Sequence, residues 1–177
     1  MTFDVLIIGG GLVGASLAAA LKSSGLNMAL VETQPTAPPT NNEGWDNRIY
    51  AISPGGAAFL TQCDAWQQLD MKRVQPVETM RVFGDDDTEL DFSAYQLGEP
   101  ELAFILENRQ LQQVLWQGLP EQDNLTLFHP ARCASLVWHD DAAHLQLEDG
   151  RMLKAKLVVG ELLGATTGRY RGTAYTL

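Results

Sequence analysis

The sequence is poor in basic residues. Lys and Arg number 12 against 22 Asp and Glu, which gives the 177-residue chain a formal net charge of -10. A field of this sign repels phosphate backbones and anionic lipid headgroups. We therefore expect no nucleic-acid partner.

Cysteines, metal-ligand patterns and long apolar runs are also scarce. Cys63 and Cys133 belong to no CxxC pair, which excludes a dithiol redox centre and a zinc knuckle and indicates buried thiols in a reducing compartment. The three histidines lack metal-ligand spacing, so no metal site is expected. No stretch reaches the length of about 18 apolar residues that a membrane span needs, and no basic segment marks a signal peptide. We expect a cytoplasmic protein.

The first 32 residues predict a βαβ unit. The run FDVLIIGG is apolar and rich in β-branched residues, which is typical of a strand buried on both faces of a parallel sheet. From Leu12, apolar residues recur at helical spacing through an alanine-rich segment, and MALVE reads as a second buried strand. The chain, 45% hydrophobic, is long enough for one α/β domain with its own core.

The rest of the chain does not continue as alternating βαβ units. Residues 34–47 are rich in Pro, Thr and Asn and predict a long surface loop. Residues 79–92 predict two strands around an acidic turn, and residues 102–119 predict a strand that becomes a helix at Asn108. Three segments within 133–160 predict an antiparallel β-meander whose last strand returns to the main sheet.

A glycine cluster lies between the first predicted strand and the helix. Gly9, Gly11 and Gly14 form the pattern G-x-G-x-x-G, which allows a tight turn, close approach of a pyrophosphate and close helix packing, in that order. Glu32 ends the second predicted strand, where a carboxylate accepts the hydroxyl groups of an adenosine ribose. The pattern predicts a dinucleotide site that favours FAD or NAD over NADP; glycines used for packing alone are the alternative.

Four segments resemble the flavin-dependent aromatic hydroxylases, and among them the ubiquinone-biosynthesis (2-polyprenylphenol) type. The predicted elements differ from those of an NAD dehydrogenase, whose nucleotide-binding domain would continue with further βαβ units. The E-N-R-x-L-Q and D-x-R-x-x-A-I patterns are more specific than the glycine turn. The four segments are DVLIIGGGLVGASLAAAL at 4–21, DNRIYAIS at 46–53, LENRQLQQVLW at 106–116 and LEDGRMLKAKLVVG at 147–160.

The resemblance implies a fold and a set of cofactor contacts. Residues 1–160 would form the N-terminal part of a Rossmann-like FAD-binding domain of the glutathione-reductase-like type, with a parallel sheet and an antiparallel meander. The ADP half of FAD would be held by Gly9, Gly11, Gly14 and Glu32. Arg48 would lie near the pyrophosphate and flavin, and Asn108 and Arg109 near the ribityl chain and pyrophosphate. Alternatively, the two arginines are surface charges and Asn108 caps its helix.

The resemblance also implies a reaction. NAD(P)H would supply electrons, dioxygen the oxygen atom, and a polyprenylated phenol the ring that is hydroxylated in ubiquinone biosynthesis. Contact with a ubiquinone-biosynthesis complex, or peripherally with the inner membrane, would follow from such a substrate. No catalytic residue can be assigned from the sequence.

The sequence departs from the family after KLVVG. The expected A-D-G motif is absent at 161–168, so residues 161–177 form an atypical tail, and no later G-D-A segment follows. We expect a truncated form whose half-site binds FAD weakly and leaves the flavin open to water, without hydroxylase activity. Its exposed apolar surface favours self-association. An FAD-dependent oxidase of another class and a non-catalytic nucleotide-binding fragment are the alternatives.

Overall fold

The chain is organised in two compact units, as seen in a computed structural model. The structure describes residues 1–34, 44–85, 88–160, 167–170 and 173–176. One unit comprises Met1–Thr40 and Leu115–Leu177, and the other comprises Asn41–Val114. The predicted loop at 34–47 and the departure after KLVVG fall largely on 35–43 and 161–166, which lie outside the described residues.

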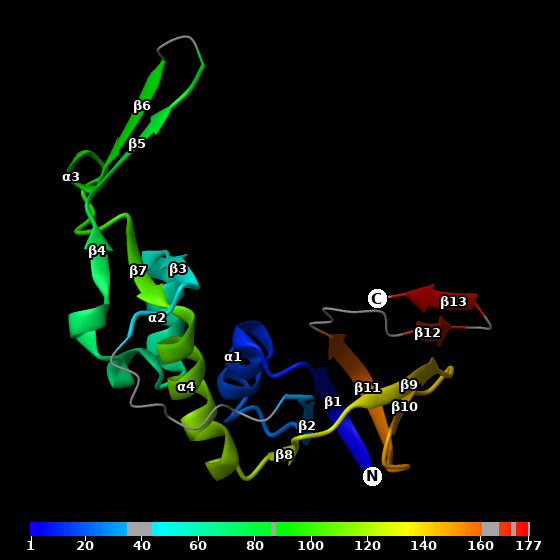
Figure 1. The fold of residues 1–177 in the computed structure, drawn as a ribbon. Helices are drawn as coiled ribbons and strands as arrows, with labels where there is room; N and C mark the ends of the chain where they lie inside the picture. The colour runs from blue at the N-terminus through cyan, green and yellow to red at the C-terminus, as the bar shows by residue number, and fades with distance from the viewer. Residues whose placement is uncertain (35–43, 86–87, 161–166, 171–172, 177) are drawn as a thin grey trace. The chain divides into compact units, whose positions relative to one another are not determined.

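A mixed sheet of eight strands forms the first unit, in the order β13-β12-β9-β10-β11-β1-β2-β8 (Figure 1). The strands are β1 (Thr2–Ile8), β2 (Met28–Val31), β8 (Leu125–Phe128), β9 (Cys133–Trp138), β10 (Ala143–Leu147), β11 (Met152–Gly160), β12 (Thr167–Tyr170) and β13 (Thr173–Thr176). Strands β8, β2, β1 and β11 run parallel, whereas β9, β10 and β11 form an antiparallel meander. The predicted combination of parallel sheet and meander is confirmed.

Helix α1 (Leu12–Ala20) connects β1 to β2 and completes the predicted βαβ unit. In the register of the sheet, Ile8 pairs with Val31 on one side and with Gly160 on the other. Gly9 and Glu32 therefore follow neighbouring parallel strands at the same edge of the sheet, where α/β proteins bind their ligands.

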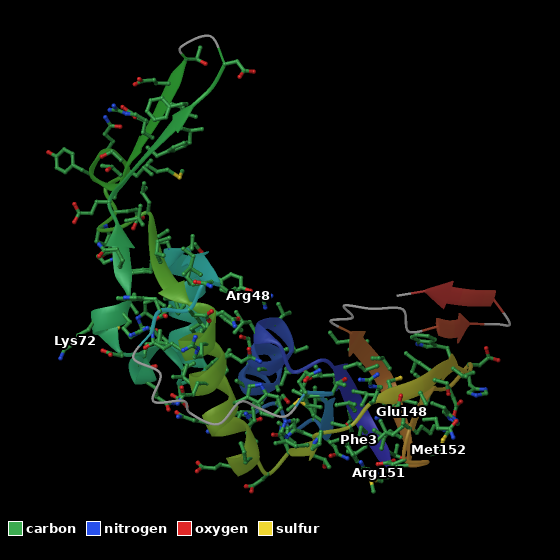
Figure 2. The ribbon with its side chains drawn as sticks, viewed as in Figure 1. Phe3, Arg48, Lys72, Glu148, Arg151 and Met152 are labelled. Atoms are coloured by element: carbon green, nitrogen blue, oxygen red, sulfur yellow. The ribbon has the colours of Figure 1, made fainter. Side chains whose placement is uncertain are left out.

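The core of the first unit lies on the sheet. Leu6, Leu30 and Leu145 are fully buried, and each such side chain contributes about 1.5–3 kcal/mol when removed from water. Phe3 packs edge-to-face on Phe128, with ring centroids 6.1 Å apart. The Arg151 guanidinium covers the Phe128 ring at 5.0 Å, and Figure 2 labels Phe3 and Arg151 at this end of the sheet.

The second unit contains two small antiparallel sheets and short helices (Figure 1). One sheet has the order β3-β7-β4, and β5 and β6 form a separate two-stranded ribbon. The elements are β3 (Ile49–Ile52), α2 (Pro54–Gln62), β4 (Gln75–Val77), β5 (Thr79–Phe83), β6 (Glu89–Ser93), α3 (Ala94–Leu97), β7 (Ala103–Glu107) and the part of α4 (Asn108–Gly118) up to Val114. The last residues of α4, from Leu115 on, belong to the first unit. Ser53 caps α2 by accepting the N–H of Gly56, and Pro54 occupies the first turn, where its missing N–H costs little.

Helix α4 begins at Asn108, as predicted. The helical spacing of its apolar residues also predicts an inward face made of Leu111, Val114, Leu115 and Leu119. This face is confirmed, because the first three side chains are buried in α4 and Leu119 is buried in the 3-10 turn that follows. Within the described part of the chain, no helix has the length and apolarity required to cross a membrane.

The cysteines are less buried than expected. Cys63 and Cys133 are both half-buried, so the prediction that these thiols are buried was wrong. Cys63 lies at the C-terminal end of α2 and Cys133 at the first position of β9, and element ends are less enclosed than their centres. Their partial burial still raises the pKa of both thiols.

Candidate nucleotide-binding site

The turn between β1 and α1 has the backbone geometry that glycine permits. Gly9 has a φ of 103°, a conformation that other residues rarely adopt, and its N–H donates to the carbonyl oxygen of Val31 at 2.8 Å. A Cβ at Gly14 would collide with the carbonyl oxygen of Gly9. Gly11 is the N-cap of α1 and brings no side chain to the helix N terminus. The turn can therefore present backbone N–H groups and the positive end of the helix dipole to an anion.

Glu32 lies beside this turn, and two backbone N–H groups orient its carboxylate. Oε2 accepts the N–H of Gly10 at 2.5 Å, and Oε1 accepts the N–H of Gln34 at 2.7 Å. Each carboxylate oxygen has two acceptor positions, so each retains one for a ligand hydroxyl. A pair of adjacent ribose hydroxyls matches this arrangement.

Trp116, near the end of α4, also contacts the glycine turn. Its indole Nε1–H donates to the carbonyl oxygen of Gly10 at 2.7 Å, and the side chain is buried. A Cβ at Gly10 would collide with the indole ring. The sequence interpretation missed this residue, although a buried tryptophan usually finds a partner for its N–H.

These residues fit the ADP half of a dinucleotide. Glycines that cannot be replaced without collision, a helix N terminus and an oriented carboxylate converge at one edge of the sheet. The glycines and the helix N terminus match a pyrophosphate, and the carboxylate matches a ribose. Among the described residues, no group of three or more His, Cys, Asp or Glu could hold a metal ion.

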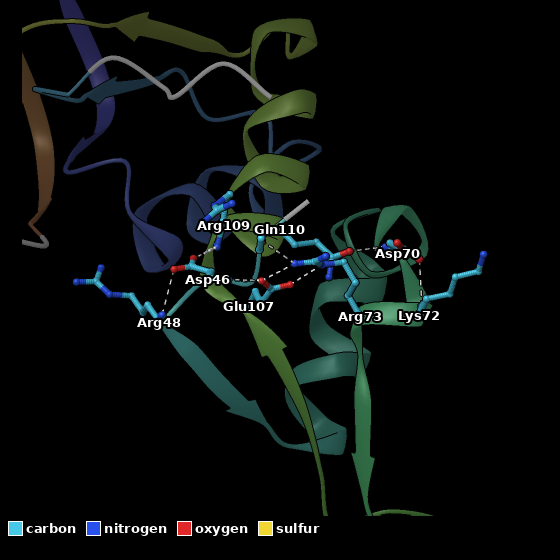
Figure 3. Close-up of polar contacts among 9 residues, drawn as sticks. Asp46, Arg48, Asp70, Lys72, Arg73, Glu107, Arg109 and Gln110 are labelled. Atoms are coloured by element: carbon cyan, nitrogen blue, oxygen red, sulfur yellow. Dashed lines mark hydrogen bonds and ion pairs between the residues drawn. The ribbon is translucent and has the colours of Figure 1, made fainter. Parts of the chain in front are cut away.

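In the second unit, Asp46 connects the D-x-R and E-N-R segments (Figure 3). Its Oδ1 accepts the N–H of Arg48 at 3.1 Å, and its Oδ2 accepts the N–H of Arg109 at 3.0 Å. The N–H of Asn108 donates to the carbonyl oxygen of Arg48 at 2.9 Å. These N–H groups hold the Asp46 carboxylate in its charged form and lower its pKa, with the Arg48 N–H as the largest cause.

An ion pair between the partly exposed Arg73 and the buried Glu107 supports these two segments. Arg73 donates through Nε and Nη2 to the two carboxylate oxygens of Glu107, at 2.6 and 2.8 Å, and Glu107 is only 4% exposed. The N–H of Asp46 donates to Oε1 of the same carboxylate at 2.5 Å. The Arg73 hydrogen bonds lower the pKa of Glu107, and Glu107 in turn raises the pKa of Arg73. The guanidinium of Arg73 also lies 4.3 Å from the ring centroid of Trp45.

The predicted site residues fall into two groups. Gly9, Gly11, Gly14 and Glu32 come together in the first unit. Arg48, Asn108 and Arg109 come together in the second unit, through backbone contacts. Arg48 is exposed, and its guanidinium points away from Asp46 (Figure 3). Over the described part of the chain, neither the Arg48 nor the Arg109 guanidinium forms an ion pair.

Comparisons with known proteins agree with the sequence motifs. A family model described as lycopene cyclase protein matches residues 4–170. The chain is 33% identical over 157 residues to 3-demethoxyubiquinol 3-hydroxylase of Escherichia coli (strain K12), covering 89% of this chain and 40% of that protein. It is also 33% identical over 167 residues to the mitochondrial ubiquinone biosynthesis monooxygenase COQ6 of Drosophila melanogaster, covering 89% of this chain and 35% of that protein. These relatives confirm the predicted resemblance to ubiquinone-biosynthesis hydroxylases.

A solved structure shares the fold. The flavin-dependent monooxygenase PieE, in complex with FAD and substrate, matches 94% of this chain and 33% of its own, with a TM-score of 0.67 and 16% identity. At that identity the match concerns the fold alone. The chain spans 40% or less of the length of the two curated relatives described above.

Proposed function

The chain belongs to the lycopene cyclase protein family, and we propose that it forms the ADP-binding part of an FAD-dependent monooxygenase that hydroxylates a polyprenylated phenol in ubiquinone biosynthesis. The observation that carries this proposal is the Glu32 carboxylate, which two backbone N–H groups orient beside the glycine turn. The reaction follows the names of the curated relatives, which are hydroxylases and not cyclases.

The first unit would hold the adenosine and pyrophosphate. Glu32 would accept the two ribose hydroxyls on its remaining acceptor positions. The N–H of Gly11 and the N–H groups of the first turn of α1 would donate to the pyrophosphate, while Gly14 keeps the helix close enough to do so. When bound, FAD would supply the redox chemistry, and the chain's own residues bind and orient it.

The second unit would contribute positive charge. We assign Arg48 to the pyrophosphate and flavin side, and Asn108 and Arg109 to the ribityl and pyrophosphate region. The support is that Asp46 fixes the backbone of both arginines while their guanidinium groups form no ion pair among the described residues. A fixed backbone with an available guanidinium suits recognition of a phosphate group.

The remaining features of the proposal follow from the relatives. We assign residues 1–160 to an FAD-binding domain of the glutathione-reductase-like type, NAD(P)H to the role of reductant, and dioxygen and a polyprenyl phenol to the role of substrates. A polyprenyl substrate would bring the protein into peripheral contact with a membrane or with a ubiquinone-biosynthesis complex.

Self-association is part of the proposal and is supported by the β5–β6 ribbon. In its register Met80 lies opposite Phe92 and Val82 opposite Leu90, so four apolar side chains share one face. They are 38–56% exposed, whereas the opposite face carries the Arg81–Asp91 ion pair. Because a two-stranded ribbon is marginally stable alone, covering this face in a second copy would stabilise it.

Ligand titration of the purified chain tests the cofactor. We expect binding of both ADP and FAD in isothermal titration calorimetry, with weak affinity for FAD, because the chain spans only part of its relatives. A chain that binds neither ligand contradicts the proposal.

A chimera tests the reaction. Residues 4–160 of this chain would replace the matching part of the Escherichia coli relative, and NADPH oxidation and product would be followed with a polyprenyl phenol. Phenol-stimulated NADPH consumption with hydroxylated product supports the monooxygenase. A chimera that binds FAD and consumes oxygen without hydroxylation and without a need for NADPH instead supports an oxidase.

A further inference from the structure

We infer that Trp116 is a positioning residue for the pyrophosphate: its indole sets the direction in which the Gly11 N–H points. This inference rests on the proposed function. It concerns a side chain that neither the glycine pattern nor the E-N-R-x-L-Q pattern includes, and that approaches the turn from 106 positions away in the sequence.

The planarity of the peptide bond links the direction of the Gly10 carbonyl to that of the Gly11 N–H. The carbonyl of Gly10 and the N–H of Gly11 belong to one peptide group, and in a trans peptide they point in opposite directions. Because the Trp116 Nε1–H holds the Gly10 carbonyl oxygen at 2.7 Å, the Gly11 N–H is directed away from the indole. Glycine on both sides of this peptide leaves the backbone unusually free to rotate, so the indole supplies a constraint that the chain itself lacks.

The preceding peptide group is fixed as well. The N–H of Gly10 donates to Oε2 of Glu32, so Gly10 is held through its N–H by a carboxylate and through its carbonyl by an indole. Through Gly10, these two hydrogen bonds connect the Glu32 carboxylate, which would bind the ribose, with the Gly11 N–H, which would bind the pyrophosphate. The arrangement prepares both groups before a ligand arrives, which reduces the entropy cost of binding.

Steric contacts restrict the position further. A Cβ at Gly10 would collide with the indole ring and would approach the Cβ and Cγ of Glu32 to 3.1 and 3.2 Å. The indole also lies beside the His129 ring, with ring centroids 5.0 Å apart. Trp116 is only 8% exposed, so its N–H faces the Gly10 carbonyl in a setting that largely excludes water. A hydrogen bond in such a setting is electrostatically stronger than one in water.

Trp116→Phe tests the inference, because phenylalanine keeps an aromatic ring and removes the N–H. We expect the affinity for ADP to fall about fivefold, as the loss of one hydrogen bond predicts. The affinity for adenosine, which has the ribose but no pyrophosphate, should change less than about twofold, a smaller effect than the loss of one hydrogen bond. Trp138→Phe, in the same unit, is the matched control and should leave both affinities unchanged.

The pattern of outcomes separates the two proposals. If the unsubstituted chain binds neither ADP nor FAD, the proposed function fails. If it binds both and Trp116→Phe binds ADP equally well, the inference fails and the proposed function stands. If Trp116→Phe loses adenosine and ADP affinity in equal proportion, the indole acts only through Glu32 or through general packing, which also overturns the inference.

An NMR measurement on the unsubstituted chain covers the case in which Trp116→Phe does not fold. On titration with ADP, the Gly11 amide proton should shift far more than it does with adenosine, and the Trp116 indole proton should stay protected from solvent exchange. A Gly11 amide that responds equally to both ligands, or an indole proton that exchanges freely, overturns the inference.

Discussion

The carboxylate of Asp46 accepts the backbone N–H of Arg109 at 3.0 Å, across 63 positions of the sequence. Arg109 lies in the first turn of α4, where N–H groups lack partners within the helix. Asp46 therefore stabilises the helix start from a separate segment, and an acidic group at this end also suits the helix dipole. Two of the four segments that carry the family resemblance, 46–53 and 106–116, are therefore joined through their backbones.

Removing Arg73 should destabilise the second unit far more than removing an exposed arginine. In Arg73→Ala the buried Glu107 carboxylate would lose its ion-pair partner, and an unpaired buried charge is strongly unfavourable. The matched control is Arg81→Ala, whose partner Asp91 is solvent-exposed. We expect thermal unfolding to show a much larger decrease in Tm for Arg73→Ala. Equal decreases would mean that the Arg73–Glu107 pair contributes no more than a surface pair.

The same ion pair predicts a loss of stability in acid. Arg73 lowers the pKa of Glu107 in the folded chain below the ordinary value of 4.5. The unfolded chain therefore takes up the proton first as the pH falls, so the contribution of Glu107 is complete above pH 4.5 and is lost as the pH approaches the lowered value.

Glu107→Gln removes this titration. We expect the decrease of Tm below pH 4.5 to become shallower in the variant, although not flat, because the pKa of Asp46 is also lowered. The measurement is Tm as a function of pH for both proteins. An identical slope in the two proteins would show that Glu107 is not a source of the acid sensitivity.

Gly14→Ala should disturb the glycine turn. The added Cβ would collide with the Gly9 carbonyl oxygen, which is backbone and cannot move aside cheaply. Overpacking of this kind costs about 1–3 kcal/mol of unfolding free energy, and displacing α1 should also weaken ADP binding. Gly118→Ala is the matched control, since its Cβ would meet nothing within 4 Å. Denaturant unfolding and ADP titration of both variants provide the test, and a fully stable Gly14→Ala would contradict the close packing.

The local pattern of the sequence was sufficient for much of the fold. The start of α4 at Asn108 and the meander from β9 to β11 follow from apolar periodicity and turn residues, which are properties of neighbouring positions. The positions of the glycine turn and of Glu32 were also predictable. Each directly follows a strand that the local pattern predicts, and the two strands are neighbours in the sheet.

Contacts between distant polar residues could not be predicted in this way. Arg73 lies 34 positions before Glu107, in a short 3-10 turn with no apolar period to indicate its partner. Trp116 directly follows Leu115 on the predicted inward face of α4, yet its contact with Gly10 depends on where the helix packs. Such pairs are fixed by tertiary structure, and residue spacing carries no signal for them.

Glu32→Gln should weaken ADP binding more than the loss of one neutral hydrogen bond would. Both carboxylate oxygens accept a backbone N–H, from Gly10 and from Gln34, so an amide in either orientation places its NH2 against one of these donors. Hydrogen bonds to charged groups contribute about 1.5–3 kcal/mol, which corresponds to a decrease in affinity of roughly 10- to 150-fold. Calorimetric titration with ADP measures the effect. Glu121→Gln makes the same chemical change at an exposed position and should bind ADP as the unsubstituted chain does. If Glu32→Gln binds ADP within about twofold of that control, a difference smaller than one ordinary hydrogen bond, then the carboxylate does not hold the ribose.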